Sequence, residues 1–297
     1  MQVGFIGLGT MGMPMAKNIL KENGSLYASD LVEEKKEEIR ALGATIASNE
    51  EIAKTCDVVF ISMPTVKADE IVVSGEDGLI AHGKEGLWIV DTSTVGYQLS
   101  KAQSEEAAKK GIVYVDLPIS GGAGRAADGD LSVMLGATKE ESDKAGLTPL
   151  LECISREVHY AGVRGGGVAL KIINNMLSKA ILFADAEAVV MAEHMGIPFD
   201  TLYEVIQSSS SQNEIFRIKQ EHIKHNEYGQ SNKSYSPITM SLKDLKLARE
   251  LLDELHLPGF NCNNMIQWYN MGMQRGYAEK DSSSLAGLLR ELYPIQE

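Results

Sequence analysis

Residues 3–24 read VGFIGLGTMGMPMAKNILKENG, and they decide the fold of the first part of the chain. An apolar run leads directly into three glycines, and an amphipathic helical pattern with Pro14 in its first turn follows them. Gly7 suits a tight turn, Gly9 lets a backbone approach a pyrophosphate, and Gly12 allows a helix to pack closely on a strand. The stretch therefore predicts a dinucleotide-binding turn made of Gly7, Leu8, Gly9, Thr10, Met11 and Gly12.

Asp30 ends the second apolar run, LYASD, and lies 18 residues beyond Gly12. A carboxylate at this distance accepts hydrogen bonds from the ribose diol of NAD and repels the 2′-phosphate of NADP. The next residue is Leu31 rather than an arginine that would bind the phosphate. These residues predict NAD as the cofactor and disfavour NADP, while a turn or a helix N-cap is the purely structural alternative for Asp30.

Short apolar runs alternate with amphipathic helical patterns through the first part of the chain. Such alternation predicts βαβ units and a parallel sheet, whose buried strands are apolar on both faces. The runs are VGFIG (3–7), LYASD (26–30), DVVFIS (57–62), LWIVD (87–91), VYVD (113–116) and LSVML (131–135). We expect an α/β domain over residues 1–161, with a Rossmann-type, doubly wound, mostly parallel sheet.

From residue 162 onward the pattern changes to helix alone. The glycine-rich VRGGGVALK at 163–171 opens a long helical pattern, whose middle, at 180–196, is apolar on nearly all sides. A helix of that kind is buried inside a domain or between subunits. Further helical patterns occupy residues 199–208, 213–226, 240–256, 261–275 and 282–292. We expect an all-α domain over residues 162–297, entered by a long interdomain helix, and a homodimer or homotetramer.

The composition argues against several classes of protein. The formal net charge is −13, which disfavours a nucleic-acid-binding protein with a basic surface. No uncharged apolar run reaches about 18 residues, so neither a membrane span nor a membrane partner is expected. Cys56, Cys153 and Cys262 are too scattered for a disulfide framework, and no basic segment precedes the first apolar run. A reducing, cytoplasmic location is the expectation.

Hydride transfer at a carbonyl carbon needs a group that moves a proton at the oxygen. Tyr97 and Lys101 have a Y-x-x-x-K spacing, but they follow a strand directly and are interpreted as the start of a surface helix. The six histidines show no ligand spacing and no cysteine cluster joins them, so no metal site is predicted. Lys171 and Asn175 share one face of a mostly apolar helix, which favours Lys171 as proton donor. A lysine that extends to solvent is the structural alternative.

Six sequence blocks together resemble the β-hydroxyacid dehydrogenase family, the group of 3-hydroxyisobutyrate dehydrogenase, tartronate semialdehyde reductase and the glyoxylate and succinic semialdehyde reductases. The blocks are GFIGLGTMGMPMAKNIL (4–20), CDVVFISMP (56–64), VDTSTV (90–95), VDLPISGG (115–122), GGGVALKIINNM (165–176) and SLKDLKLA (241–248). They keep the family's order nearly from end to end. The resemblance implies an NAD-dependent oxidoreductase that interconverts a small 3-hydroxy acid and its semialdehyde or keto acid.

The resemblance also implies roles for matching positions. Lys171 matches the catalytic lysine, which is the general acid in reduction and the base in oxidation. The turn of Ser120, Gly121 and Gly122 matches the site of the substrate carboxylate, and Asn175 matches the amide that orients the substrate. Met63, Pro64 and Thr94 match positions that line the nicotinamide side of the cofactor. Lys243 matches a lysine of the helical domain that reaches the cofactor. The implied partner is a small carboxylate or sulfonate substrate.

Two other functions remain open beside this one. An imine reductase on the same scaffold usually lacks the lysine found here at position 171. A non-catalytic NAD(H)-binding module would be expected to have lost Lys171, Asn175 or the turn at 120–122, and all of them are present.

The chain departs from the family pattern at a few positions. Asp30 and Leu31 stand where many members carry Asn-Arg, which supports NAD. The stretch SSSSQNEIF at 208–216 lies where members differ, and it is either a determinant of substrate choice or a polar turn. The identity of the hydroxy acid and the physiological direction stay open.

Overall fold

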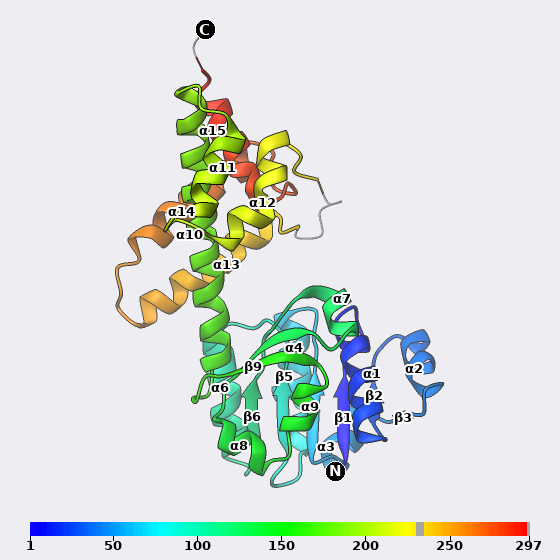
Figure 1. Ribbon diagram of the computed structural model, residues 1–297. Helices are drawn as coiled ribbons and strands as arrows, with labels where there is room; N and C mark the ends of the chain where they lie inside the picture. Colours follow the sequence, from blue (N-terminus) through cyan, green and yellow to red (C-terminus); the bar gives the residue numbers. More distant parts are fainter. Residues whose placement is uncertain (230–234, 296–297) are drawn as a thin grey trace. The chain divides into compact units, whose positions relative to one another are not determined.

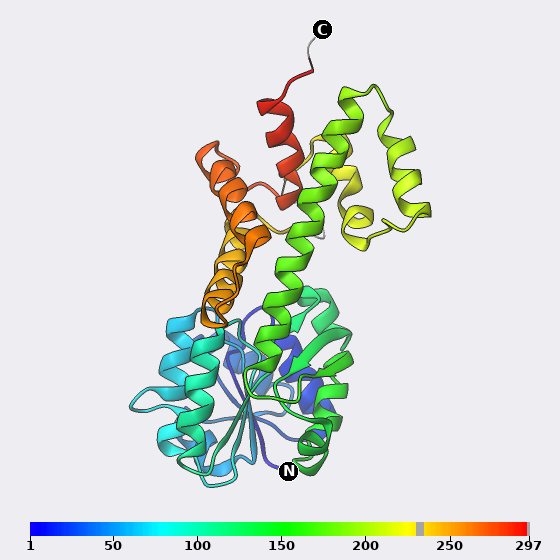
Figure 2. The ribbon, with the colours of Figure 1, turned by 90° about the vertical axis from the view of Figure 1, so that its left-hand side faces the viewer.

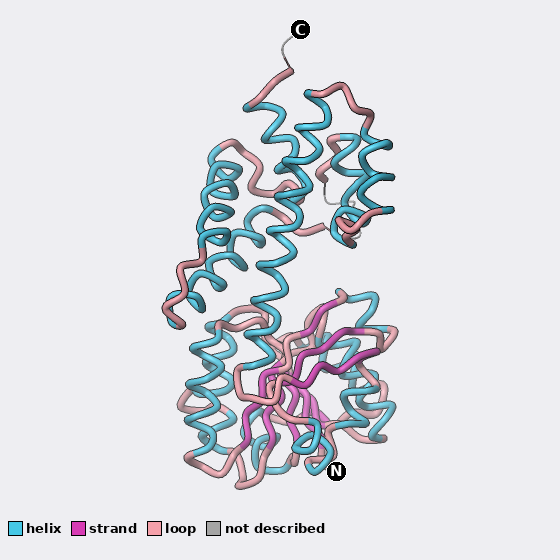
Figure 3. Tube along the Cα trace, turned by 60° about the vertical axis from the view of Figure 1, so that its left-hand side comes forward, coloured by secondary structure: helices cyan, strands magenta, loops and turns pink. Residues whose placement is uncertain are grey.

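The computed structural model describes residues 1–229 and 235–295, and the chain divides into two compact units, Met1–Lys171 and Ile172–Glu297. Figure 1 traces both units along the sequence. All the strands among the described residues belong to the first unit, as the magenta segments of Figure 3 show. The second unit is helical. Each unit is described by itself below.

Six parallel strands form the main sheet of the first unit, in the spatial order β3-β2-β1-β4-β5-β6. This is the doubly wound Rossmann order, and its direction of winding reverses between β1 and β4. The strands are β1 (Val3–Ile6), β2 (Tyr27–Ser29), β3 (Thr45–Ile46), β4 (Val58–Ile61), β5 (Trp88–Asp91) and β6 (Val113–Asp116). The predicted sheet is confirmed, and ligands of such sheets bind at the carboxyl ends of the strands beside the reversal.

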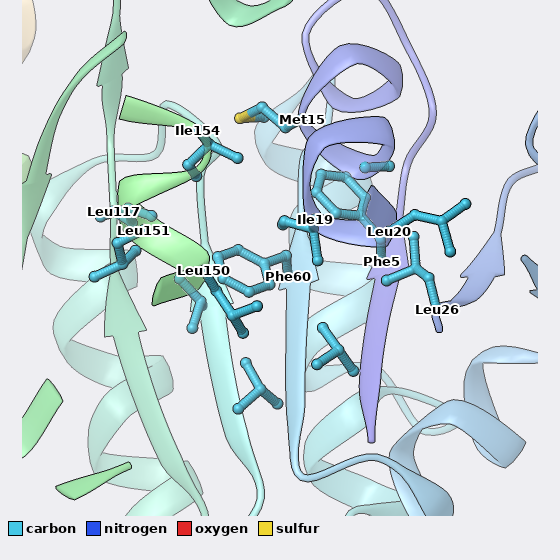
Figure 4. Close-up of a cluster of buried hydrophobic side chains, with 14 of the residues drawn as sticks. Phe5, Met15, Ile19, Leu20, Leu26, Phe60, Leu117, Leu150, Leu151 and Ile154 are labelled. Atoms are coloured by element: carbon cyan, nitrogen blue, oxygen red, sulfur yellow. The ribbon is translucent and has the colours of Figure 1, made fainter. Parts of the chain in front are cut away.

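Helices cover both faces of this sheet because its strands bury side chains on both sides. One apolar cluster includes Phe5 and Phe60, whose rings stack 6.1 Å apart, together with Met15 and Ile19 of α1 (Figure 4). The opposite cluster contains Val59, Ile89 and Tyr114. The helices that accompany the six strands are α1 (Gly12–Asn23), α2 (Glu33–Arg40), α3 (Asn49–Thr55), α4 (Val66–Ser74), α5 (Leu79–His82) and α6 (Tyr97–Ala108).

A second, three-stranded sheet completes the first unit, in the order β7-β8-β9. Strand β8 (Leu131–Leu135) was predicted, but β7 (Ile119–Ser120), β9 (Ser155–Tyr160) and the short β3 were not. β3 and β7 contain two residues each, and β9 reads SREVHY, in which half of the side chains are exposed and no apolar run is continuous. Three short helices connect this region: α7 (Gly122–Ala127), α8 (Lys139–Lys144) and α9 (Thr148–Glu152).

The second unit consists of helices where the sequence predicts them. Figure 2 shows α10 (Gly166–His194) as one unbroken helix, which begins in the first unit. Phe216 is buried in the second unit and meets the edges of the Phe199 and Tyr203 rings. The helices after α10 are α11 (Phe199–Ser208), α12 (Glu214–His225), α13 (Ile238–Glu254), α14 (Phe260–Gln274), the 3₁₀ turn η1 (Ser282–Ser284) and α15 (Leu285–Leu292).

Helix α10 is only partly covered by its own chain. Leu182, Ala186 and Val189 are buried, whereas Leu177 and Met191 are 55% and 67% exposed. By length and composition alone α10 is long and apolar enough to cross a membrane, and 28% of its apolar stretch is buried. An apolar helix with one uncovered side is also typical of the core helix of an assembly.

Candidate functional site

The glycine-rich turn after β1 is built from three glycines with different surroundings. Gly7 has φ +93°, and a Cβ there would lie 2.4 Å from the carbonyl oxygen of Ser62. A Cβ at Gly12 would lie 1.8 Å from the carbonyl oxygen of Gly7, so α1 packs on the turn with no room for a side chain. A Cβ at Gly9 would meet nothing within 4 Å. Gly9 and Thr10 are exposed, and this open turn at a helix N-terminus suits a pyrophosphate.

Asp30 connects the end of β2 to this turn. One carboxylate oxygen of Asp30 accepts the N–H of Leu8 at 2.5 Å and the other accepts the N–H of Val32 at 2.8 Å. Leu8 itself is buried, and the bond to Asp30 already uses its N–H within the protein. The carboxylate oxygens keep further lone pairs, so the position fits a ribose diol, and the local bonds also give Asp30 a structural role.

Met63, Pro64 and Thr94 lie in the two loops that follow β4 and β5. These strands are neighbours, with Ile61 opposite Asp91, so the loops emerge side by side. The N–H of Met63 donates to Ser93 Oγ at 2.9 Å, which ties one loop to the other. Pro64 and Thr94 are exposed. The contact between Gly7 and Ser62 places the glycine turn against the first of these loops, at the reversal of the sheet.

Lys171 lies beside the Ser120–Gly122 turn in the first unit. Its ammonium donates a hydrogen bond to the carbonyl oxygen of Ile119, the residue just before Ser120, although 52 residues separate them. Gly121 and Gly122 have φ values of 141° and 76°, and both are exposed together with Ser120. Adjacent backbone amides in such conformations form a concave site for anions. The structure thus brings the predicted lysine and the predicted turn together.

Asp116 positions the start of the helix that carries Lys171. It is buried at the end of β6, and its two oxygens accept the N–H groups of Gly165 at 2.8 Å and Val168 at 2.7 Å. Burial raises the pKa of Asp116, and these backbone hydrogen bonds partly offset that effect. A Cβ at Gly136 would lie 1.9 Å from the carboxylate, so a glycine is needed there. Asp116 therefore links the sheet directly to the first turn of α10.

Sequence reasoning did not single out Asp116 as a functional residue. The available signal was an acidic side chain at the carboxyl end of an apolar strand, directly before the LPISGG segment. Such a position is buried in a parallel sheet, where an acidic side chain needs hydrogen-bond donors.

Asn175 belongs to the second unit and is held by a residue that the sequence analysis missed. Its Nδ2 donates to Asp244 Oδ2 on α13 at 3.0 Å. Asp244 follows Lys243, which is exposed on the same helix. Lys171 and Asn175 are one turn apart on α10 and share a face by helix geometry.

The alternatives considered for the chemistry have structural positions of their own. Tyr97 is the first residue of α6 and Lys101 is exposed on that helix. Within residues 1–229 and 235–295, no group of three or more His, Cys, Asp or Glu is placed to hold a metal ion. The segment at 208–216 joins α11 to α12, where Asn213 accepts the N–H of Phe216 and donates to Asp185 at 3.0 Å.

Two family models match the chain in succession. The NAD-binding domain of 6-phosphogluconate dehydrogenase matches residues 2–162. The domain described as the NAD-binding part of NADP-dependent 3-hydroxyisobutyrate dehydrogenase matches residues 165–289. Both descriptions name a nicotinamide cofactor, and together they span nearly the whole chain.

Curated relatives match over nearly their full lengths. The chain is 34% identical to 2-(hydroxymethyl)glutarate dehydrogenase of Eubacterium barkeri, over 96% of this chain and 93% of the relative. It is 33% identical to the mitochondrial 3-hydroxyisobutyrate dehydrogenase of Mus musculus, over 99% of this chain and 88% of the relative.

A solved structure matches the fold of the whole chain. The structure of 3-hydroxyisobutyrate dehydrogenase from Mycobacterium tuberculosis superimposes with a TM-score of 0.83 at 24% identity, covering 97% of this chain and 99% of that one. The glycine turn, the strand order, the family models and the relatives agree. The chain belongs to the β-hydroxyacid dehydrogenase family, whose members are nicotinamide-dependent dehydrogenases of hydroxy acids.

Proposed function

We propose that this chain is an NAD-preferring dehydrogenase of a small 3-hydroxy acid, in which Lys171 moves the proton and the Ser120–Gly122 turn binds the substrate carboxylate. The observation that supports the proposal most directly is the hydrogen bond from the Lys171 ammonium to the carbonyl of Ile119, immediately before that turn. A cation next to a glycine-rich turn suits an anionic substrate whose second oxygen gains or loses a proton.

When bound, the nicotinamide cofactor supplies or accepts a hydride at its C4 atom. Lys171 donates a proton to the carbonyl oxygen of the substrate in the reductive direction and takes it back from the hydroxyl in the oxidative direction. The turn at 120–122 holds the carboxylate, and Asn175 donates to the substrate oxygens while Asp244 fixes the orientation of its amide. The open space at Gly9 fits the pyrophosphate of such a cofactor.

The names of the two curated relatives support the substrate class. Both 2-(hydroxymethyl)glutarate and 3-hydroxyisobutyrate have a hydroxyl group on the carbon β to a carboxylate. In such a molecule only a short carbon chain separates the hydroxyl from the carboxylate. If the turn at Ser120–Gly122 binds the carboxylate, the hydroxyl lies near the neighbouring Lys171. A panel of semialdehydes and keto acids, including methylmalonate, tartronate and succinic semialdehydes and glyoxylate, ranked by kcat/KM with NADH, identifies the substrate.

The surroundings of Asp30 support NAD rather than NADP. Leu31 is fully exposed and offers no positive charge, and the first turn of α2 carries Glu33 and Glu34. The Asp30 carboxylate would repel a 2′-phosphate, whereas Glu33 already forms an ion pair with Lys36 at 2.6 Å. Steady-state rates with NADH and NADPH test this choice, and a preference for NADPH would contradict it.

The uncovered side of α10 supports a homo-oligomer. Ile173, Leu177 and Met191 are each at least half exposed on this helix, which is unusual for large apolar side chains on one surface. We propose that a second copy of the chain covers them in a dimer or tetramer. A monomer in light scattering at micromolar concentration would contradict this assignment.

Replacement of Lys171 tests the proposed chemistry. Lys171→Ala is expected to lower kcat by about 10²–10⁴-fold, because the proton donor is lost while the glycine turn still binds the cofactor. NADH binding, followed by its fluorescence, is expected to be unchanged. Lys144→Ala is the matched control, since Lys144 is an exposed lysine of the same unit. A rate near that of the wild type for Lys171→Ala would overturn the assignment.

A further inference from the structure

Two acidic side chains lie completely inside the first unit, behind the loops that follow β4 and β5. Asp69 on α4 is 0% exposed, and Asp91 at the end of β5 is 1% exposed. An ionised carboxylate is costly to bury unless a cation or several donors compensate it. The proposed chemistry uses neither residue, so their burial needs another explanation.

The hydrogen-bond partners of this pair leave one oxygen without a donor. Asp91 accepts the N–H of Ser93 at 2.7 Å and the hydroxyl of Tyr114 at 2.6 Å. Asp69 Oδ1 accepts the side-chain amide of Gln103 at 2.8 Å, whereas Asp69 Oδ2 is buried and has no donor. The two carboxyl groups influence each other: hydrogen bonding with Asp91 lowers the pKa of Asp69, and the charge of Asp69 raises the pKa of Asp91. A proton between them would satisfy the remaining oxygen.

The groups around the pair favour that proton. Neither carboxyl forms an ion pair with a cationic side chain among the described residues. The titratable groups that face the pair are acids, namely Glu70 from α4 and Tyr114 and Asp116 from β6, while α6 contributes the neutral Gln103 and β4 is apolar. Burial first, and then Asp69, raises the pKa of Asp91 to about 8; burial also raises the pKa of Asp69.

Ser93 connects the pair to the residues assigned to the nicotinamide. Its N–H donates to Asp91 at 2.7 Å, and its hydroxyl oxygen accepts the N–H of Met63 at 2.9 Å. The hydroxyl of Thr92 donates to the carbonyl of Ile61 at 2.7 Å, which ties the same two loops a second time. Through Ser93, the carboxyl pair is thus connected to the point where the loop of Met63 and Pro64 is bonded to the loop of Thr94.

We propose that Asp69 and Asp91 share one proton in the working enzyme, and that the protonated pair is a positioning element that keeps the two loops in place for the cofactor. The inference rests on the proposed function, because it takes Met63, Pro64 and Thr94 as cofactor positions. When the proton leaves at alkaline pH, two buried negative charges face each other, the junction at Ser93 is weakened, and cofactor affinity falls.

The variant Asp69→Asn tests this proposal with little change of shape. The amide oxygen can accept from Gln103 as before, and the amide N–H replaces the shared proton at every pH. In the wild type, the dissociation constant of NADH is expected to rise about tenfold between about pH 7 and pH 9.5, while in Asp69→Asn it stays within about twofold. The measurement is NADH fluorescence at constant ionic strength. Glu76→Gln, an exposed acid of the same unit, is the control and keeps the wild-type profile.

An infrared measurement gives a second, binding-independent result. A protonated carboxylic acid has a carbonyl stretch that ionised carboxylates lack, so the wild type at neutral pH should show a buried carboxylic-acid band that Asp69→Asn has lost. Absence of this band from the wild type, or identical pH profiles for the two proteins, would overturn the proposal. A wild type that binds no NADH at any pH would instead contradict the proposed function itself.

Discussion

Two buried ionisable clusters, one in each unit, differ in how their charge is compensated. In the helical unit, Lys219 and Asp281 are 7% and 0% exposed and form an ion pair at 2.7 Å. Asp281 also accepts the N–H groups of Ser236 and Ser283. In the sheet unit, Asp69 and Asp91 face each other without an ion pair to a cationic side chain of the described residues. Lys219 stabilises the ionised form of Asp281. Asp69 and Asp91 have no such cation within the described part of the chain, so this pair keeps a proton.

The two clusters therefore respond to pH in opposite directions. Burial alone would raise the pKa of Asp281, but Lys219 and the hydrogen bonds outweigh it and hold the pKa below the usual range. Its contribution to stability is present above about pH 4 and is lost as the pH falls further. The pKa of Asp91 is raised, to about 8. Between about pH 4 and about pH 8 the folded protein binds more protons than the unfolded chain, so the free energy of unfolding falls as the pH rises through this range.

Removing the cation of the balanced cluster should have the largest effect on stability. Lys219→Ala leaves the Asp281 carboxylate buried without its ion-pair partner, and the free energy of unfolding is expected to fall by about 3–5 kcal/mol. Denaturant unfolding at neutral pH measures the change. Lys144→Ala, which removes an exposed ion pair with Glu140, is the control and should cost less than about 1 kcal/mol. Equal losses of unfolding free energy in the two variants would mean that the buried ion pair stabilises the protein no more than the exposed one.

Asp116 is a third buried carboxylate, compensated by backbone amides rather than by a cation or a shared proton. Asp116→Ala leaves the N–H groups of Gly165 and Val168 without their acceptor, and unfolding free energy is expected to fall by about 1–3 kcal/mol. The kcat should fall as well, because the first turn of α10 positions Lys171. Asp116→Asn retains one acceptor oxygen, so its unfolding free energy and its kcat should lie between those of the wild type and of the alanine variant. An alanine variant with unchanged stability and rate would show that the cap is dispensable.

Neutralising the unbalanced pair should stabilise the protein, by a smaller amount. The Asp69→Asn variant does not need to bind a proton on folding. Its free energy of unfolding should therefore exceed that of the wild type by about 1–2 kcal/mol at about pH 8. The gap should shrink as the pH falls towards 5, since the wild-type pair is then protonated at little cost. Melting temperatures of the two proteins across this range, without cofactor, measure the difference. A gap of constant size at every pH would argue that the pair holds no proton.

Much of the fold was predictable because local pattern and tertiary environment agree. Six strands of the first unit are continuous apolar runs, and the helices from α11 to α15 follow a clear helical period. The strands β3, β7 and β9 were not predicted because two of them are very short and the third, SREVHY, has no continuous apolar run. Their pairing depends on neighbouring strands that lie far away in sequence, and local propensity does not contain that information.

By itself the sequence determined the glycine turn, the parallel sheet, the division into sheet and helical parts, and Lys171 as the residue to test. These features depend on residue type and spacing along one segment, which a sequence displays directly. Tertiary structure alone decided that Lys171 meets Ile119, that Asp116 holds the first turn of α10, and that Asp69 faces Asp91. The physical reason is that compensation of a buried charge comes from groups that are neighbours in space and not in sequence.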